Sequence, residues 1–414
     1  MIGAMVLQPF TTGIGALGRW SAIAIGASVP VSIALDNVLL AVALLAWLVG
    51  LQYRDKLRQT WANPVYRAAL LLFVVLLTGT LYGKPAPGDA NLFLLKYLDL
   101  ALIPVLGWAF ITASSREQGL RTLACGLTLV LLISCALKIG LIPPDPWLRG
   151  TPESLLRGMP ESPVVFKQRL THNILMAFSG FLFAWLCVSA RAGIAKIGWG
   201  SLSLLAVANT MLMVEGATGY VLLAALALLF SWQHLRFRGV GITIVLSLII
   251  AATLIMVPGP FQNRAGQILH ELEQESADRP ATTSTGFRME FYRNTMTLIE
   301  KNPLFGTGTG SFPAAYAELV KGTGQNPSRN PHNEFMLITV QTGLIGLAAF
   351  LWLLWQQWRL APQLPTPIER GLAQGLVVMM GIICMLNSAL LDHTEGLLYA
   401  WLTALLYAGL KSDA

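Results

Sequence analysis

The sequence predicts an all-α integral membrane protein with about twelve transmembrane helices. Hydrophobic residues make up 55% of its 414 residues, and the mean hydropathy is +0.61. Only 12% of the residues are charged, whereas roughly 25% is usual in a soluble domain. Apolar runs of about 18 residues or more, long enough to cross a bilayer as helices, recur along the chain. We place these runs at residues 10–30, 32–52, 67–83, 92–113, 119–141, 170–190, 195–214, 217–233, 239–257, 333–356, 371–391 and 394–410.

Two long polar segments divide these runs into blocks. The first covers residues 142–168 and contains prolines that disfavour a helix. The second covers residues 258–332, and we expect a mainly helical periplasmic domain there, inserted between the ninth and tenth spans. Residues 1–257 then hold spans one to nine, and residues 333–414 hold spans ten to twelve.

Within the second polar segment, two helices are predicted. Residues 261–277 have helical periodicity and carry three glutamates, which is typical of a solvated helix. The cap sequence Ser284-Thr285-Gly286 precedes a second helix, which ends near Lys301-Asn302-Pro303.

Basic residues determine the predicted orientation, because short connections rich in Lys and Arg stay in the cytoplasm. They fall on every second connection, as a serpentine chain requires. Both termini are then cytoplasmic, and both long polar segments face outward. The start of the chain lacks the basic stretch of a signal peptide, so we expect the first run to be a retained helix. The basic residues on the predicted inner side are Arg54, Lys56, Arg58, Arg67, Arg116, Arg121, Arg191, Lys196, Arg236, Arg238, Arg359 and Arg370.

The net charge of +7 and the pI of 9.3 do not indicate a nucleic-acid-binding protein. Much of the positive charge lies in the inner connections, and no run of five Lys or Arg exists. The four cysteines, Cys125, Cys135, Cys187 and Cys384, lie in apolar runs, so we interpret them as buried small hydrophobes. The preference for basic residues in inner connections does not explain those on the predicted outer side. These outer basic residues are Arg149, Arg157, Lys167, Arg169, Arg264, Arg279, Arg288, Arg293, Lys301, Lys321 and Arg329.

Three candidate binding residues, Lys167, Arg169 and His172, lie at the outer mouth of the sixth span. Arg169 and His172 are three residues apart, so in a helix they would share a face. These residues either contact a phosphate group or serve as anchors whose charged heads reach the membrane interface.

Arg288 lies in the first turn of the second predicted outer helix, beside its apolar face. Two roles are open for it, which are binding an anion and pairing with a carboxylate. A planar guanidinium can hold a phosphate through two parallel hydrogen bonds, which favours the first role.

His332 is the candidate catalytic residue. It lies at the outer edge of an apolar run, with Arg329 one turn before it and Asn333 and Glu334 after it to orient an imidazole. Histidine is the side chain best suited to act as a general base near neutral pH. The alternative is a hydrogen-bonded histidine at the membrane interface.

A glycine-rich stretch at residues 304–312 does not fit a nucleotide-binding loop, because its glycines do not form G-x-G-x-x-G and no strand precedes them. It predicts a tight turn with close backbone approach, and its N–H groups could secondarily help to bind an anion. The nearest candidate for a metal site is 392–395, which reads Asp-His-Thr-Glu. We favour a polar lining there, and we expect neither a metal nor another cofactor.

Several of these motifs resemble the bacterial O-antigen ligase and polymerase superfamily. They are TGFRMEFY at 285–292, NPLFGTG at 302–308, PHNEF at 331–335 and QTGLIG at 341–346, together with FKQRLTHN at 166–173 and the stretch 387–395.

The resemblance implies a metal-independent glycosyltransferase of the bacterial inner membrane, with its active site facing the periplasm. The donor would be a glycan on undecaprenyl diphosphate, and a ligase would transfer it to a sugar hydroxyl of lipid A–core. By the family pattern, Arg288 would bind the diphosphate with Arg169 and Lys167, and His172 lies beside them. His332 would activate the acceptor or assist at the reacting centre. Membrane lipid is the other expected partner.

One position departs from the family pattern, since Ala217 stands where the family usually has an arginine. Either another basic residue substitutes, or the chain is a less active form, or the alignment is out of register. Two other functions also remain open. An O-antigen polymerase or protein O-oligosaccharyltransferase would share the donor but not the acceptor. A transporter of a lipid-linked or anionic solute would need charges deep in its spans, for which Asp36, Lys96, Asp99 and Lys138 are candidates.

Overall fold

The computed structural model of the chain describes residues 13–50, 52–142, 159, 161–274 and 281–410. Its regular elements are helices, and the β-structure in these ranges is one bridge between Met159 and Ser162. The all-α class is therefore confirmed for the described part of the chain. Arg149, Arg157 and Arg279, like most of the first polar segment, lie outside it.

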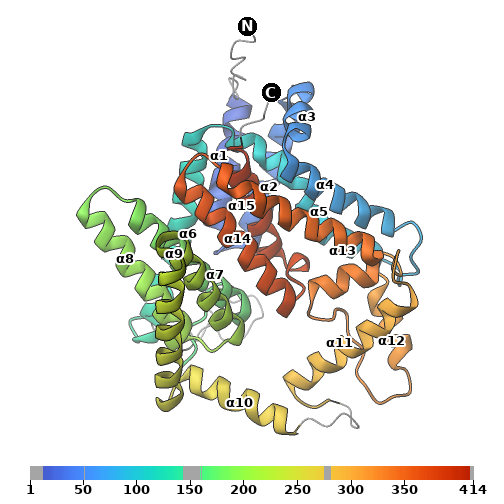
Figure 1. The fold of residues 1–414 in the computed structure, drawn as a ribbon. Helices are drawn as coiled ribbons and strands as arrows, with labels where there is room; N and C mark the ends of the chain where they lie inside the picture. The colour runs from blue at the N-terminus through green and yellow to red at the C-terminus, as the bar shows by residue number, and fades with distance from the viewer. Residues whose placement is uncertain (1–12, 51, 143–158, 160, 275–280, 411–414) are drawn as a thin grey trace.

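The helices of the first half follow the predicted apolar runs to within a few residues (Figure 1). They are α1 (Gly13–Ser28), α2 (Ile33–Val49), α4 (Pro64–Gly79), α5 (Asp89–Gly107, continued by η1, Trp108–Phe110), α6 (Ala113–Lys138), α7 (Arg169–Ser189) and α8 (Gly193–Ala208, followed by the π-helical η3, Asn209–Met213).

The eighth and ninth predicted spans form two helical segments under the single label α9 (Ala217–Met256), and they meet at Arg236, whose φ of 55° and ψ of −146° are not helical. The chain folds back at this break, because Ser231 Oγ lies 2.5 Å from Thr243 Oγ1 and the ring centroids of Tyr220 and Phe261 are 5.0 Å apart. In one straight helix each of these pairs would be far apart, since an α-helix rises about 1.5 Å per residue.

The last three predicted spans correspond to α13 (Glu334–Leu360, extended by η4, Ala361–Gln363), α14 (Pro367–Leu386) and α15 (His393–Tyr407), with η5 (Ala389–Leu391) before α15. Six helices in the described ranges are long and apolar enough to cross a membrane. These six are α5 with η1, α6, α7, α9, α13 with η4, and α14. The count of twelve spans stays a prediction.

The second polar segment contains the two expected helices, α10 (Pro260–Gln274) and α11 (Ser284–Lys301). The end of the first predicted helix, residues 275–277, falls outside the described ranges. Two short helices were not predicted. One is α12 (Phe312–Val320), which starts at the Pro313 turn after the glycines. The other is α3 (Tyr53–Ala62), which occupies a basic connection.

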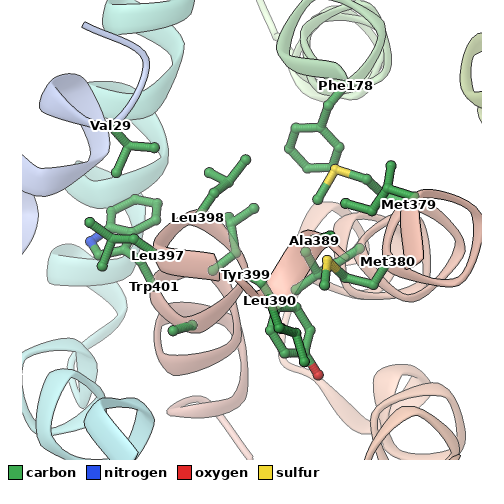
Figure 2. Close-up of a cluster of buried hydrophobic side chains, with 14 of the residues drawn as sticks. Val29, Phe178, Met379, Met380, Ala389, Leu390, Leu397, Leu398, Tyr399 and Trp401 are labelled. Atoms are coloured by element: carbon green, nitrogen blue, oxygen red, sulfur yellow. The ribbon is translucent and has the colours of Figure 1, made fainter. Parts of the chain in front are cut away.

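The core of the protein lies where α14 and α15 meet α7 and α1. Figure 2 shows Met379 and Met380 of α14 between Phe178 of α7 and Leu390 of η5, with Trp401 of α15 towards α1. These side chains are 3% exposed or less. The dense packing holds η5 and the start of α15 in place, and the candidate site is built on that turn.

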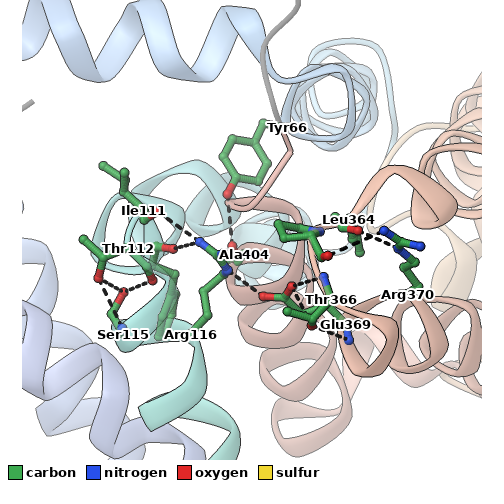
Figure 3. Close-up of polar contacts among 12 residues, drawn as sticks. Tyr66, Ile111, Thr112, Ser115, Arg116, Leu364, Thr366, Glu369, Arg370 and Ala404 are labelled. Atoms are coloured by element: carbon green, nitrogen blue, oxygen red, sulfur yellow. Dashed lines mark hydrogen bonds and ion pairs between the residues drawn. The ribbon is translucent and has the colours of Figure 1, made fainter. Parts of the chain in front are cut away.

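A buried ion pair ties two predicted inner connections together. Arg116 Nε lies 2.6 Å from Glu369 Oε1, and both side chains are at most 6% exposed (Figure 3). The same glutamate closes a capping box with Thr366 at the start of α14. Asn63 Nδ2 also donates to the carbonyl of Tyr407, at 2.9 Å. These contacts bring three of the predicted inner connections and the end of α15 to one end of the bundle, while α10, α11 and α12 lie at the other (Figure 1).

The four cysteines are free. Only Cys384 is buried, and Cys125 is exposed, which corrects the expectation that all four are buried. Cys125 is exposed because the buried residues of α6 lie on the opposite face of that helix.

Candidate functional site

A cavity of ≈ 440 Å³ brings together residues that are far apart in the sequence. Five parts of the chain form its wall: the start of α2, the approach to α7, the first turn of α11, the segment before α13 and the turn from α14 into α15. The lining residues are Ile33, Phe166, Lys167, Gln168, Leu170, Thr171, Arg288, Asn330, His332, Asn387, Asp392, His393, Thr394 and Glu395.

His332 is held in this wall by its backbone and its ring. Its φ of 54° is in the left-handed region, where few residues other than glycine lie. Its N–H donates to Asn330 Oδ1 at 2.9 Å, and its carbonyl accepts from the Tyr292 hydroxyl at 3.3 Å. The ring stacks on Phe291 with centroids 5.8 Å apart. Backbone strain of this kind persists only where the surroundings hold it, as at functional sites.

The amide of Asn387 sets the orientation of the imidazole. His332 Nδ1 lies 3.2 Å from Asn387 Oδ1, and Asn387 Nδ2 donates to Asp392 Oδ2 at 3.0 Å. Because Asp392 accepts from the amide nitrogen, the amide oxygen faces His332, and Nδ1 must be the donor in that contact. Nε2 of the neutral ring then has a free lone pair, as a general base requires.

Asn333 and Glu334, which were expected to orient His332, form hydrogen bonds with other residues. Asn333 Oδ1 caps α13 by accepting from the Met336 N–H, at 3.0 Å. Glu334 is fully buried and points into the core, where it accepts from the Tyr97 hydroxyl at 2.8 Å and from the Leu390 N–H at 3.0 Å. The prediction that these two neighbours orient the imidazole was therefore wrong. Helix α13 directs the Glu334 side chain away from the His332 ring. Glu334 instead fixes η5, which carries Asn387 and Asp392 on either side.

Arg288 projects into the cavity from the first turn of α11. That turn is fixed by Thr283, whose Oγ1 accepts from the Gly286 N–H at 3.0 Å. The half-buried Arg288 side chain makes no hydrogen bond or ion pair with any residue in the described ranges. Of the two roles open to it, pairing with a carboxylate is therefore not seen within those ranges. Arg329 does form such a pair, 2.6 Å from Asp89 Oδ1, and it lies outside the lining.

Lys167 is the second cation of the cavity. Its side chain is only 5% exposed, and its Nζ has no hydrogen-bond partner in the described structure. Loss of water around the amine lowers the pKa of Lys167, and the negative charges of Asp36 and Glu395 oppose this shift. A buried ammonium without a partner is costly, so an anion that entered the cavity would relieve that cost.

Arg169 and His172 are not brought into the cavity. Arg169 is exposed at the start of α7. His172 is fully buried, its Nδ1 accepts from the Val165 N–H at 3.4 Å, and its Nε2 lies 3.1 Å from Asn209 Oδ1. The two residues are three apart in the chain but differ in environment, because α7 presents one to solvent and the other to the core.

The glycine-rich stretch packs against other backbone, as predicted. A Cβ on Gly308 would lie 2.1 Å from the Gly83 Cα, and the φ of Gly308 is 99°. Its N–H groups are already engaged: those of Thr307, Gly308, Thr309 and Gly310 donate to Val340, Gln341 and Gly79. The alternative that these groups bind an anion is therefore wrong. Instead they fix α13 at its break, where Gly343 has a φ of 68°.

Residues 392–395 line the cavity. His393 Nε2 lies 3.5 Å from Asp36 Oδ2, and Thr171 Oγ1 donates to Glu395 Oε1 at 2.7 Å. Within the described ranges no three His, Cys, Asp or Glu side chains are grouped as metal ligands.

Taken together, the long apolar helices and this cavity define an α-helical membrane protein. Its polar site combines an oriented histidine with two cationic side chains that have no ion-pair partner within the described ranges. The family model described as O-antigen ligase matches residues 202–351, a segment that contains both Arg288 and His332. This match, over part of the chain, supports a member of the O-antigen ligase and polymerase superfamily. No curated protein matches it.

Proposed function

We propose that this protein transfers an O-antigen glycan from undecaprenyl diphosphate to a sugar hydroxyl of lipid A–core, at the periplasmic face of the bacterial inner membrane. The observation that carries the proposal is the meeting of Arg288, Lys167 and the oriented His332 in one cavity. A glycosyl transfer of this kind needs positive charge for the leaving diphosphate and a base for the acceptor, and we assign these roles to the two cations and to His332.

The cations would act on the leaving group. When the bond between C1 of the sugar and the phosphate oxygen breaks, the electron pair goes to the diphosphate, whose negative charge grows. Charge-assisted hydrogen bonds from Arg288 and Lys167 would stabilise that charge where it develops. No ion pair must first be broken to free Arg288 within the described structure. Two fixed protein cations can supply stabilisation that other transferases take from a metal ion, and on this ground we propose that the reaction is metal-independent.

The histidine would act on the acceptor. Its Nε2 would take the proton of the acceptor hydroxyl while the hydroxyl oxygen forms a bond to C1. The Nδ1–H contact to Asn387 would hold the ring in place as it becomes positively charged. Direct displacement of this kind inverts the configuration at C1.

Arg169 and His172 take different places in this proposal. We give His172 no contact with the donor, because both ring nitrogens have partners in the protein. Arg169 and Arg264 lie within electrostatic range of the Tyr220 hydroxyl, near the start of α9 where Ala217 stands. We propose these two arginines as the basic residues that substitute for an arginine at that position.

The test is a transfer assay with purified full-length protein, an undecaprenyl-diphosphate-linked glycan and lipid A–core, in the presence of EDTA. We expect the glycan to appear on lipid A–core without added metal. Parallel reactions replace lipid A–core with a peptide or with a second lipid-linked glycan. Transfer only to the peptide would indicate a protein O-oligosaccharyltransferase, and transfer only to the glycan a polymerase. No transfer to any acceptor would contradict the proposal and favour a transporter, and activity lost in EDTA but rescued by Mg²⁺ would contradict its metal-free chemistry.

A further inference from the structure

Helix α3 differs from the apolar helices around it. Three of its ten residues are basic and one is acidic, and it forms a short polar insertion between two apolar helices. The chain axis turns by 114° between α2 and α3. If α2 crosses the bilayer, a helix at that angle lies closer to the membrane plane than to the membrane normal.

One face of α3 is fixed to the protein. Lys56 is 2% exposed, its Nζ donates to the carbonyl of Trp47, and it lies 4.7 Å from the Trp47 ring centroid and 5.9 Å from that of Trp108. The next helix begins at once, because the Asn63 side chain caps α4. Since both flanks are held, the exposed face of α3 has a defined direction.

That exposed face is amphipathic. Tyr53, Leu57 and Trp61 are 42%, 55% and 62% exposed and recur every four residues. At about 100° per residue, they cover an arc of about 80° along the helix. Arg54 and Arg58 are also exposed, and they lie about 20° and about 60° beyond Trp61 around the helix. An apolar strip beside a basic strip is the pattern of a helix lying at a membrane surface.

We propose that α3 lies on the inner surface of the membrane and binds anionic phospholipid headgroups. Tyr53, Leu57 and Trp61 enter the acyl boundary, and Arg54 and Arg58 contact the phosphate level. Charge complementarity identifies the occupant. The two arginines form no ion pair in the described structure, and they lie on a connection whose basic residues place it on the cytoplasmic side, where anionic lipids give the leaflet a negative surface. This surface is independent of the transfer chemistry, since α3 lies at the opposite end of the bundle from α10 and α11 (Figure 1).

The test is a native mass spectrometry titration of the full-length protein in detergent with phosphatidylglycerol, and separately with phosphatidylcholine. We expect tighter binding of phosphatidylglycerol. A basic side chain near an anionic membrane surface contributes about fivefold in affinity, so Arg54→Gln with Arg58→Gln should weaken binding by about 25-fold. The control pair is Arg191→Gln with Arg238→Gln, two exposed inner-side residues away from α3, and it should change little.

A second variant guards against a folding defect. Arg54→Lys with Arg58→Lys keeps both charges and should retain most of the binding. Equal affinity for both lipids, an equal loss in the control pair, or no loss in the glutamine pair would overturn the proposal. If neither lipid bound, the face would belong to a protein partner instead, and the proposal would be wrong.

Discussion

His332 and Asn387 are 55 residues apart in the chain, yet His332 Nδ1 lies 3.2 Å from Asn387 Oδ1. The contact joins the segment before α13 to the turn after α14. The buried Glu334 holds that turn by accepting a hydrogen bond from the Leu390 N–H. The orientation of His332, the candidate base, therefore depends on Asn387, although Asn387 does not touch the proton that His332 would remove.

Replacing Asn387 tests this dependence. Without the amide oxygen, the imidazole of His332 can rotate and exchange tautomers. We expect Asn387→Ala to lower kcat by roughly 10–100-fold, the usual effect of removing a partner that orients a functional histidine, with donor binding nearly unchanged. Transfer rates and donor affinity are measured side by side. Asn263→Ala, in an exposed asparagine of α10, is the control, and an equal effect there would remove Asn387 from the orienting role.

The fold was predictable from the sequence where hydrophobicity alone decides it. Each apolar run became a helix because a backbone in lipid must satisfy its own hydrogen bonds. The boundary between the eighth and ninth spans was predictable from charge, because Arg236 and Arg238 indicate a connection and the helical backbone breaks at Arg236. Helix α3 was missed because it is short and polar, so its apolar residues show no run.

For the candidate site, the sequence indicated residue types but not their arrangement in space. Arg288, Lys167 and His332 were selected because a phosphate and a hydroxyl proton call for these residue types. Their meeting in one cavity depends on how α7, α11 and α13 pack, which local sequence does not contain. For the same reason Asn387 was missed as the partner of His332, and His172 was grouped with residues it does not meet. The one indication of Asn387 in the sequence was its place in the stretch 387–395, which resembles the O-antigen ligase and polymerase superfamily.

His332→Ala is expected to insert and fold normally, because the ring lies at the edge of a cavity and not in the apolar core. The variant should bind the lipid diphosphate, since Arg288 and Lys167 remain. Transfer should fall by roughly 10²–10⁴-fold, the contribution usual for a positioned general base. The measurements are size-exclusion chromatography, donor binding and initial rates. A variant that fails only because the donor no longer binds would move His332 from proton transfer to binding.

Arg288→Lys should be impaired nearly as much as Arg288→Ala. The guanidinium can make two parallel hydrogen bonds to a phosphate, which an ammonium cannot reproduce. Loss of a charged hydrogen bond should weaken donor binding or transfer by roughly 1.5–3 kcal/mol. Arg293→Ala, an exposed arginine later in the same helix, is the matched control and should be close to normal. If lysine at position 288 restored full turnover, a point charge would suffice and the two-bond contact would be refuted.

Lys167 predicts an alkaline limit to donor binding. Loss of water lowers the pKa of its amine from the ordinary 10.5, and the amine is charged only below its pKa. As pH rises, Lys167 should therefore lose its charge earlier than an exposed lysine would, and donor affinity should fall over the same range. A bound diphosphate favours the charged form, so the bound complex should take up a proton at pH values near the lowered pKa.

Donor affinity is measured from neutral to alkaline pH for the unaltered protein, for Lys167→Arg and for Lys167→Met. The arginine variant keeps its charge throughout and should lose the alkaline fall, whereas the methionine variant should bind weakly at every pH. An alkaline fall that persists unchanged in both variants would assign it to another group and exclude Lys167 from the diphosphate site.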